Sequence, residues 1–330
     1  MTRQTPGVTD VARGGVTNLR LRPPGPHPAV GLVAPSDREI VRELEDHGAA
    51  SLWVGGHVAS PNPTPEAMVW LARLVEQTER AIVGTATLLL PLFPPALVAK
   101  QIADLDRAAA GRVALGIGVG GEYASDFDAC GIPIEERGSR TNEAMELLRA
   151  FWTGEPVTHH GRHWDFDGLR IHPPPQQSGG PPIVVTGRQP VAMRRAARLG
   201  DGWMPYLYSP ERYARSVATI REEAQRIGRD LDAFTWCAYV FVSMDDDRDV
   251  ARTNAVHALG GTYRNDFSEM IDRVAAVGTP EDVTAKLDAF VGAGVEHFVL
   301  CPIGPNAAEN ARHLVRDVAR SLDRGSPTHG

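Results

Sequence analysis

The strongest constraint on the fold is the repeated alternation of short apolar runs with amphipathic segments from residue 29 to residue 322. Each apolar run has the length of a buried parallel strand, and most amphipathic segments have the length of a crossover helix. Eight such units in about 295 residues favour a TIM (β/α)8 barrel over a doubly wound sheet. The predicted strands cover 29–33, 51–54, 82–89, 113–119, 183–186, 202–205, 234–243 and 296–301.

No linker interrupts this alternation, so we expect one domain over residues 29–324. Residues 1–28 carry four arginines among Gly, Pro and Thr, with almost no apolar periodicity. This composition predicts a flexible N-terminal arm, with a segment that covers a partner subunit as the alternative. We expect a short tail at residues 325–330.

Residues 156–171 depart from the strand and helix alternation. They alternate around two glycines in the manner of a β-hairpin, which we expect to be inserted after the fourth helix. His159, His160 and His163, with two aspartates, raise the possibility of a metal site. Alternation would place His160 on the opposite face from the other two histidines, so we expect no metal there.

Composition narrows the class of partner. The net charge is −7, from 34 Lys and Arg against 41 Asp and Glu, and no basic run with interleaved aromatics indicates nucleic-acid binding. The apolar stretches are shorter than the roughly 18 residues of a membrane helix, and the N-terminus lacks a signal-peptide core, so we expect a cytoplasmic protein.

Cys130, Cys237 and Cys301 lack disulfide or zinc spacing. Lys100 and Lys286 lie in helical patterns, which disfavours Schiff-base chemistry.

A glycine-rich turn closes the fourth strand. Its glycines clear side chains from the carboxyl end of the strand, so a flat or anionic ligand can approach the backbone. The alternative is that these glycines only let the strand pack tightly. The G-x-G-x-x-G spacing is satisfied, but neither the helix nor the acidic residue of a dinucleotide site follows, and we expect a loop after the turn. The glycines are Gly116, Gly118, Gly120 and Gly121.

The other strand ends contain few carboxylate pairs or metal ligands, which favours an organic cofactor that brings its own reactivity. His57 and Glu122 are the candidate proton-transfer groups, and an ordinary loop histidine is the alternative for His57. Thr186, Gly187 and Arg188 precede a helix, so their hydroxyl, amide and guanidinium groups predict a phosphate cradle. The alternative there is a helix cap with a surface arginine.

Several motifs, in order and at matching spacing, resemble the bacterial luciferase-like superfamily, and particularly its members that depend on the deazaflavin coenzyme F420. The resemblance runs from about residue 31 to residue 322. The motifs that carry it are Ala-Ser-Leu-Trp-Val-Gly-Gly-His at 50–57, Val-Gly-Thr-Ala-Thr-Leu-Leu-Leu-Pro at 83–91, Gly-Arg-Val-Ala-Leu-Gly-Ile-Gly at 111–118, Glu-Arg-Gly-Ser-Arg at 136–140, Arg-Ala-Ala-Arg-Leu-Gly-Asp-Gly-Trp at 195–203 and Val-Gly-Thr-Pro-Glu-Asp at 277–282.

The resemblance implies a luciferase-like TIM barrel with an insertion, a reduced flavin or F420 across the strand ends, and a homodimer. It places a non-proline cis peptide bulge near Ala86 and Thr87, behind the cofactor ring. Gly118, Gly120 and Gly121 would face the cofactor, and the loop Thr186, Gly187 and Arg188 would bind its phosphate. Many F420-dependent relatives have an aspartate before the histidine, where this chain has Gly56, so the cofactor contact and the tuning of His57 that this aspartate provides are missing at that position.

Our first hypothesis is an F420-dependent oxidoreductase that transfers a hydride between the deazaflavin and a small organic substrate. His57 or Glu122 would be the proton donor or base. The enzymatic alternative is a monooxygenase that uses FMNH2 and oxygen, because FMN also has a ring and a phosphate. An alternative of another class is a non-catalytic flavin-binding protein, for which Gly56 in place of the aspartate is the only support.

Overall fold

The computed structural model describes residues 19–21 and 27–324. This part of the chain divides into two compact units. Unit 1 contains residues 21, 27–53 and 203–324, and unit 2 contains residues 19–20 and 54–202. The prediction of one domain over 29–324 stays a prediction. The predicted tail at 325–330 and most of the predicted arm lie outside the described residues.

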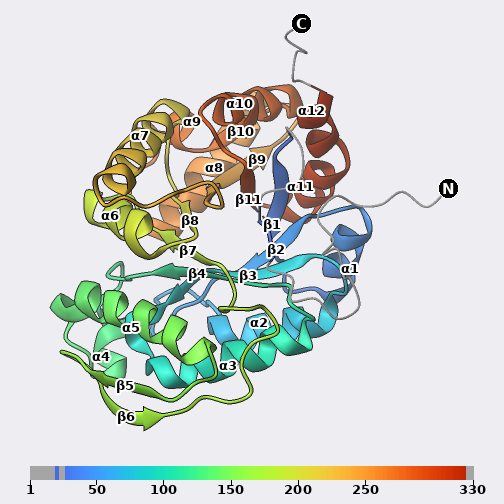
Figure 1. Ribbon diagram of the computed structural model, residues 1–330. Coiled ribbons are helices and arrows are strands. Elements are labelled where there is room, and N and C mark those ends of the chain that lie inside the picture. The colour runs from blue at the N-terminus through green and yellow to red at the C-terminus, as the bar shows by residue number, and fades with distance from the viewer. Residues whose placement is uncertain (1–18, 22–26, 325–330) are drawn as a thin grey trace, which may run out of the picture. The chain divides into compact units, whose positions relative to one another are not determined.

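The sheet of unit 1 is parallel throughout. Its strands run in the order β10-β9-β11-β1-β2, and β8 also belongs to this part of the chain (Figure 1). The strands are β1 (Ala29–Val33), β2 (Ser51–Val54), β8 (Gly202–Met204), β9 (Thr235–Met244), β10 (Ala276–Gly278) and β11 (His297–Pro302). The helices are α1 (Arg38–Asp46), α7 (Pro210–Arg226), α8 (Arg248–Tyr263), α9 (Ile271–Val274), α10 (Pro280–Gly292), α11 (Ala307–His313) and α12 (Ala319–Arg324), with a π-helical turn at Leu314–Val318.

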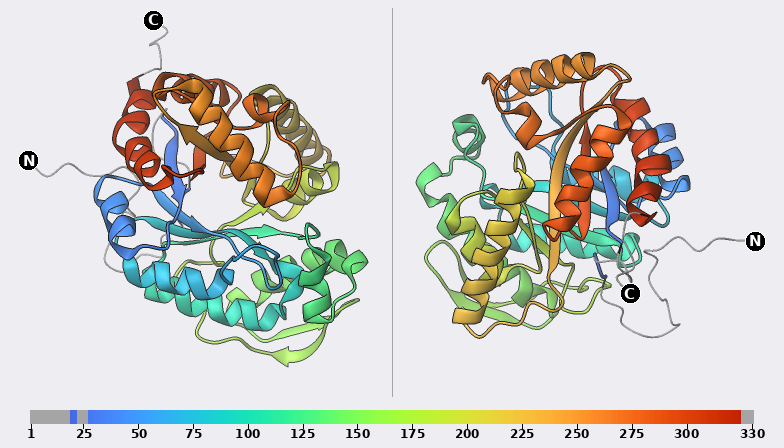
Figure 2. Two further views of the ribbon diagram at one scale, coloured as in Figure 1. Left: turned by 180° about the vertical axis from the view of Figure 1, so that it is seen from behind. Right: turned by 90° about the horizontal axis from the view of Figure 1, so that it is seen from above.

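Unit 2 also has a parallel sheet, in the order β3-β4-β7; α2 and α3 pack against it and α5 packs on α3 (Figure 2). Its strands are β3 (Ile82–Leu89), β4 (Val113–Gly118) and β7 (Ile183–Thr186), and an antiparallel hairpin is formed by β5 (Val157–His160) and β6 (Asp165–Leu169). Its helices are α2 (Ala67–Gln77), α3 (Pro95–Ala108), α4 (Ala124–Cys130), α5 (Arg137–Trp152) and α6 (Pro190–Leu199), with 3-10 turns at Leu90–Leu92 and Ile134–Glu136.

The eight predicted strands are present, with ends within one residue of the prediction, and each is followed by a helix. Within each unit's sheet the strands pair in parallel, as strands connected by crossover helices do. The fold is the predicted TIM (β/α)8 barrel. β4 is buried at every residue, which explains why its sequence is apolar without alternation. The predicted hairpin insertion after the fourth barrel helix is confirmed as β5 and β6.

Local caps define the start of α2 and the end of α4. α2 begins at Ala67, where Glu66 is the N-cap and accepts a hydrogen bond from Val69 N. The predicted loop after the glycine turn contains α4, which ends at Gly131 in a left-handed conformation with φ of 65°. A further short strand, β10, was not predicted because three residues carry no periodicity.

Part of the predicted N-terminal arm is packed. In unit 2, the backbone N–H of Leu19 donates to Gln177 Oε1 at 3.1 Å. In unit 1, His297 Nδ1 lies 2.7 Å from the carbonyl oxygen of Leu21. Both leucine side chains are buried, so the description of a flexible arm does not extend to residues 19–21.

In the described part of the chain, no helix has the length and apolar character needed to cross a bilayer. The hairpin histidines follow the predicted alternation. His159 Nε2 lies 3.1 Å from Glu143 Oε1, whereas the His160 ring is exposed beside Asp165.

Candidate active site

The ring of His57 is held by a carboxylate from a distant part of the chain. His57 follows β2, and its Nδ1 lies 2.8 Å from Asp126 Oδ2 on α4. The other carboxylate oxygen, Oδ1, accepts hydrogen bonds of 2.8 Å from the backbone N–H groups of Val58 and Ala59. The His57 side chain is 22% exposed and that of Asp126 is 1% exposed, so the ring remains accessible while its partner is buried.

The position before His57 has no room for a side chain. A Cβ atom on Gly56 would collide with the carbonyl oxygen of Pro65 and would lie 2.6 Å from the backbone nitrogen of Ala67. The entry to α2 therefore occupies the space that an aspartate at position 56 would need. Asp126, 69 residues away in the sequence, supplies the carboxylate beside His57 instead.

Glu122 is the second predicted proton-transfer group, and it lies in the same electrostatic environment. Desolvation raises the pKa of its carboxyl above the ordinary value, while the charges of His57 and Arg188 act in the opposite direction and Asp126 adds to the rise. Glu122 thus interacts electrostatically with both His57 and Arg188, two residues predicted from other parts of the sequence.

Tyr123 completes the surroundings of the histidine. Its ring meets the His57 ring edge to face, with centroids 4.9 Å apart and an interplanar angle of 66°. Asn62 Nδ2 lies 3.5 Å from the Tyr123 hydroxyl, at the limit of a hydrogen bond. Tyr123 and Asp126 were both missed as functional residues. A signal for their helix was present, since Gly131 followed by Pro133 is typical of a helix end.

The end of β3 contains an unusual backbone and an unsatisfied hydroxyl. The peptide bond between Ala86 and Thr87 is cis, as the resemblance implies, and the pairing of β3 with β4 shifts register between Thr85 and Leu88. The Thr87 Oγ1 atom is buried and has no hydrogen-bond partner among the described residues. Buried hydroxyls are normally satisfied, so a group outside the protein is the natural partner for this one.

The glycines of the turn have structural as well as potential binding roles. A Cβ atom on Gly118 would lie 2.9 Å from Thr87 Cγ2 and 3.1 Å from Thr186 Oγ1, so this glycine lets two threonines pack over the end of β4. Gly120 has φ of 66°, and a Cβ atom there would lie 3.2 Å from the Phe127 ring. Gly121 has φ of 103° and is exposed, which leaves its backbone open to a ligand.

The predicted phosphate loop lies between β7 and α6. Gly187 has φ of 129°. Gln189 is the N-cap residue of α6, and its side chain makes no capping hydrogen bond to that helix. Pro190, the first residue of α6, has no N–H group, and the Ala192 N–H already donates to Gln189 O at 2.9 Å, so the positive charge of Arg188 is the feature of this loop that favours an anion. The Thr186 hydroxyl differs from the prediction, because it already donates to Ile117 O at 2.8 Å and can serve a ligand only as an acceptor.

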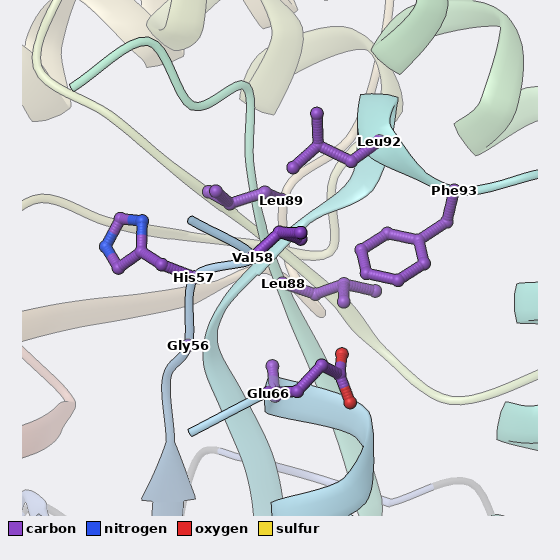
Figure 3. Close-up of a pocket in the computed structure, with 9 residues that line it drawn as sticks. Gly56, His57, Val58, Glu66, Leu88, Leu89, Leu92 and Phe93 are labelled. Atoms are coloured by element: carbon purple, nitrogen blue, oxygen red, sulfur yellow. The ribbon is translucent and has the colours of Figure 1, made fainter. Parts of the chain in front are cut away.

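A small pocket adjoins the His57 loop (Figure 3). It is lined mainly by apolar side chains, including Leu89, Leu92 and Phe93, with the Glu66 carboxylate on one side. The His57 ring points away from these apolar side chains (Figure 3). His57 is itself among the residues that line the pocket.

Comparison with known proteins relates this site to a family. Residues 23–297 match the family described as luciferase-like monooxygenase. The chain is similar to an F420-dependent glucose-6-phosphate dehydrogenase of Gordonia bronchialis, with 25% identity over 318 residues that cover 86% of this chain and 92% of the relative.

Two solved structures share the fold. An F420-dependent secondary alcohol dehydrogenase in complex with an F420-acetone adduct has a TM-score of 0.79 at 20% identity, covering 90% of this chain and 99% of its own. The oxygenating constituent of 3,6-diketocamphane monooxygenase from Pseudomonas putida, in complex with FMN, has a TM-score of 0.71 at 19% identity, covering 89% and 98%. The family match spans residues 23–297, which is most of the chain, so this chain belongs to the luciferase-like monooxygenase family.

Proposed function

We propose that the protein is an F420-dependent oxidoreductase that transfers a hydride between the deazaflavin and a small organic substrate. The observation that carries this proposal is the electrostatic grouping of Glu122 with His57 and Arg188 at the strand ends of unit 2. A proton-transfer pair beside a cation fits a redox cofactor that carries a phosphate. Similarity to an F420-dependent dehydrogenase over 86% of the chain supports the choice of cofactor.

The residues at the ends of β3 and β4 would hold the cofactor ring. Ala86 and Thr87 would lie on one side, with the buried Thr87 hydroxyl as a hydrogen-bond partner for a polar ring atom. Gly118 would let both threonines approach the strand, and Gly120 and Gly121 would expose backbone at the turn. When bound, F420 supplies or accepts the hydride, and the protein contributes shape and a few polar contacts.

The loop after β7 would hold the phosphate. Arg188 and the N-terminus of α6 supply positive charge, which favours phosphate binding. Thr186, whose hydroxyl donates to Ile117 O, would contribute contact and an acceptor atom instead of a hydrogen bond to the phosphate.

His57 and Glu122 would move the proton that accompanies the hydride. Oxidation of an alcohol requires a base to take the hydroxyl proton, and reduction of a carbonyl requires an acid to return it. The His57 ring is accessible and bonded to Asp126 through Nδ1, which leaves Nε2 for this task. Glu122, with its raised pKa, is the second candidate.

The second candidate function is an FMNH2- and oxygen-dependent monooxygenase. The fold similarity to the FMN-containing diketocamphane monooxygenase favours it, since the same loop can bind the FMN phosphate. The non-catalytic alternative loses its one support, because Asp126 provides the carboxylate that Gly56 lacks. Assembly as a homodimer, action in the cytoplasm and the absence of a nucleic-acid partner stay part of this proposal and rest on the family resemblance and composition.

The decisive experiment is a calorimetric titration of the protein with F420 and with FMN, each oxidised and reduced. We expect micromolar binding of F420 and much weaker binding of FMN. The reverse order would replace the proposal with the monooxygenase, and binding of neither would refute the site assignment.

The phosphate assignment is tested with Arg188→Ala and the deazaflavin ring fragment that lacks phosphate. The variant should weaken F420 binding by roughly tenfold, the worth of one charge-assisted hydrogen bond, and leave binding of the fragment unchanged. Arg194→Ala, an exposed arginine on the same helix α6, is the matched control. Equal losses for F420 and the fragment would contradict the assignment.

A further inference from the structure

The hydrogen bonds of Asp126 constrain the protonation of the His57 ring. An ionised carboxylate can only accept hydrogen bonds. Oδ1 of Asp126 accepts from two backbone N–H groups, Val58 and Ala59, and Oδ2 lies 2.8 Å from His57 Nδ1. The contact between Asp126 Oδ2 and His57 Nδ1 is a hydrogen bond only if Nδ1 carries a proton, because the carboxylate has none to donate. In the neutral imidazole, the lone pair then lies on Nε2.

α4 also restricts how the ring can turn. Its N-cap residue Tyr123 contacts the His57 ring edge to face, and Asp126 in its first turn binds Nδ1. Ser125 Oγ donates to the Ala59 carbonyl at 2.5 Å, so the same helix holds the backbone that follows the histidine. Three contacts from the start of one short helix thus hold the ring of His57 and the backbone that follows it.

We infer that Asp126 is the positioning residue of His57, which keeps Nδ1 protonated and presents Nε2 as the proton-accepting atom of the site. The inference deepens the proposed function, because it rests on His57 as the proton-transfer group. Asp126 does not touch the substrate or cofactor in this scheme. It acts through the histidine, and the proton that Nε2 takes up comes from the substrate hydroxyl during oxidation.

The alternative role for Asp126 is a purely structural one, in which the carboxylate only joins the loop at residues 57–59 to α4. The two roles separate in Asp126→Asn. An asparagine oxygen can still accept from the Val58 and Ala59 amides, whereas its NH2 group faces Nδ1 as a donor. His57 Nδ1 must then accept a hydrogen bond, so the neutral ring would carry its proton on Nε2. A protonated Nε2 has no free lone pair and cannot act as a base.

The experiment is nitrogen NMR of the protein with 15N-labelled histidine, at a pH where His57 is neutral and without cofactor. The His57 signals are assigned by their loss in His57→Gln. We expect the Nδ1–H tautomer in the natural protein and the Nε2–H tautomer in Asp126→Asn. Asp128→Asn, which changes an exposed carboxylate on the same helix, is the control and should leave the tautomer as it is.

Kinetics provide the second measurement, with F420 and any substrate that the protein turns over. Asp126→Asn should lower kcat by on the order of 100-fold, the typical contribution of a general base, with less than about a threefold change in the Kd for F420. An Nε2–H tautomer in the natural protein would overturn the inference. So would an Asp126→Asn variant with an unchanged tautomer, or one with faster amide exchange at residues 57–59 as its only effect.

The two measurements separate failure of this inference from failure of the proposed function. The tautomer is read in the protein alone, so the expected NMR result stands even if F420 does not bind, in which case the proposed function fails. If F420 binds and turns over but the tautomer is reversed, the proposed function stands and the inference about Asp126 fails.

Discussion

At the scale of single residues, Thr87 offers the sharpest test of the ring site. Its hydroxyl is buried without a hydrogen-bond partner in the described chain, which costs about 1–3 kcal/mol. Thr87→Val removes the unsatisfied group at nearly constant shape. We therefore expect the thermal stability of the free protein to stay the same or rise, and the Kd for F420 to increase about fivefold, as measured by thermal denaturation and calorimetry.

Thr85→Val is the matched control, because the Thr85 hydroxyl on the same strand is buried but donates to Gly116 O at 2.7 Å. This variant should lose stability by about 1 kcal/mol. If Thr87→Val loses stability in the same way and binds F420 as the natural protein does, the Thr87 hydroxyl has a partner within the protein and is not a ring contact.

His297 makes the stability of unit 1 depend on pH. Complete burial lowers its pKa from 6.5 to about 4, although the hydrogen bond to the Leu21 carbonyl acts in the opposite direction. Nδ1 must donate to that carbonyl, so Nε2 accepts from the Ser51 hydroxyl at 2.7 Å. His297 of the unfolded chain takes up a proton at higher pH than His297 of the folded chain. The contribution of His297 to the free energy of unfolding is therefore complete above about pH 6.5 and falls by about 3 kcal/mol towards pH 4.

The prediction is tested with His297→Gln, which cannot titrate. At pH 7.5 the variant should be the less stable protein, and the difference in melting temperature should narrow between pH 6.5 and pH 4. His257→Gln, at an exposed histidine of α8, should show no such narrowing. A difference for His297→Gln that stays constant over this range would mean that His297 does not control the pH dependence.

At the scale of elements, the inserted hairpin depends on one carboxylate of α5. Glu143 accepts hydrogen bonds from His159 Nε2 and from the backbone N–H groups of His163 and Trp164. Desolvation raises its pKa, but these hydrogen bonds outweigh that effect and lower the pKa below the ordinary 4.5. Glu143→Gln should increase amide exchange at residues 163–164 about tenfold at neutral pH, equivalent to one lost hydrogen bond of about 1.4 kcal/mol.

The sign of the shift adds a pH test. A carboxyl with a lowered folded pKa contributes stability above 4.5 and loses it as the pH falls through the folded value. The difference in exchange between the natural protein and Glu143→Gln should therefore shrink at strongly acidic pH. Glu146→Gln, at an exposed position of α5, should leave the hairpin unchanged at any pH, and an equal effect of the two variants would contradict the assignment.

The elements also show what could be read from the sequence. The barrel strands carry a local signal, since a run such as 113–118 is apolar at successive positions for the reason that it is buried on both faces. α4 has only one large apolar residue in its core contact, Phe127, so its periodicity is too weak to predict a helix. The link between Asp126 and His57 was not predictable, because it depends on which loops the folded chain brings together.

At the scale of the whole molecule, all the residues proposed to bind the cofactor lie in unit 2, between residues 54 and 202. Binding of F420 to these residues should therefore slow amide exchange most at 86–88, 118–122 and 186–188, measured by hydrogen exchange with mass spectrometry. At a ligand concentration of 100 times Kd, linkage adds about 2.7 kcal/mol to the stability of the bound state, enough to be read as protection of these segments.

Arg188→Ala should reduce protection at 186–188 more than at 86–88, because it removes only the phosphate contact. Protection confined to residues 203–324 would place the cofactor on unit 1 and refute the assignment, whereas protection of the three segments by FMN alone would keep the site and change the cofactor.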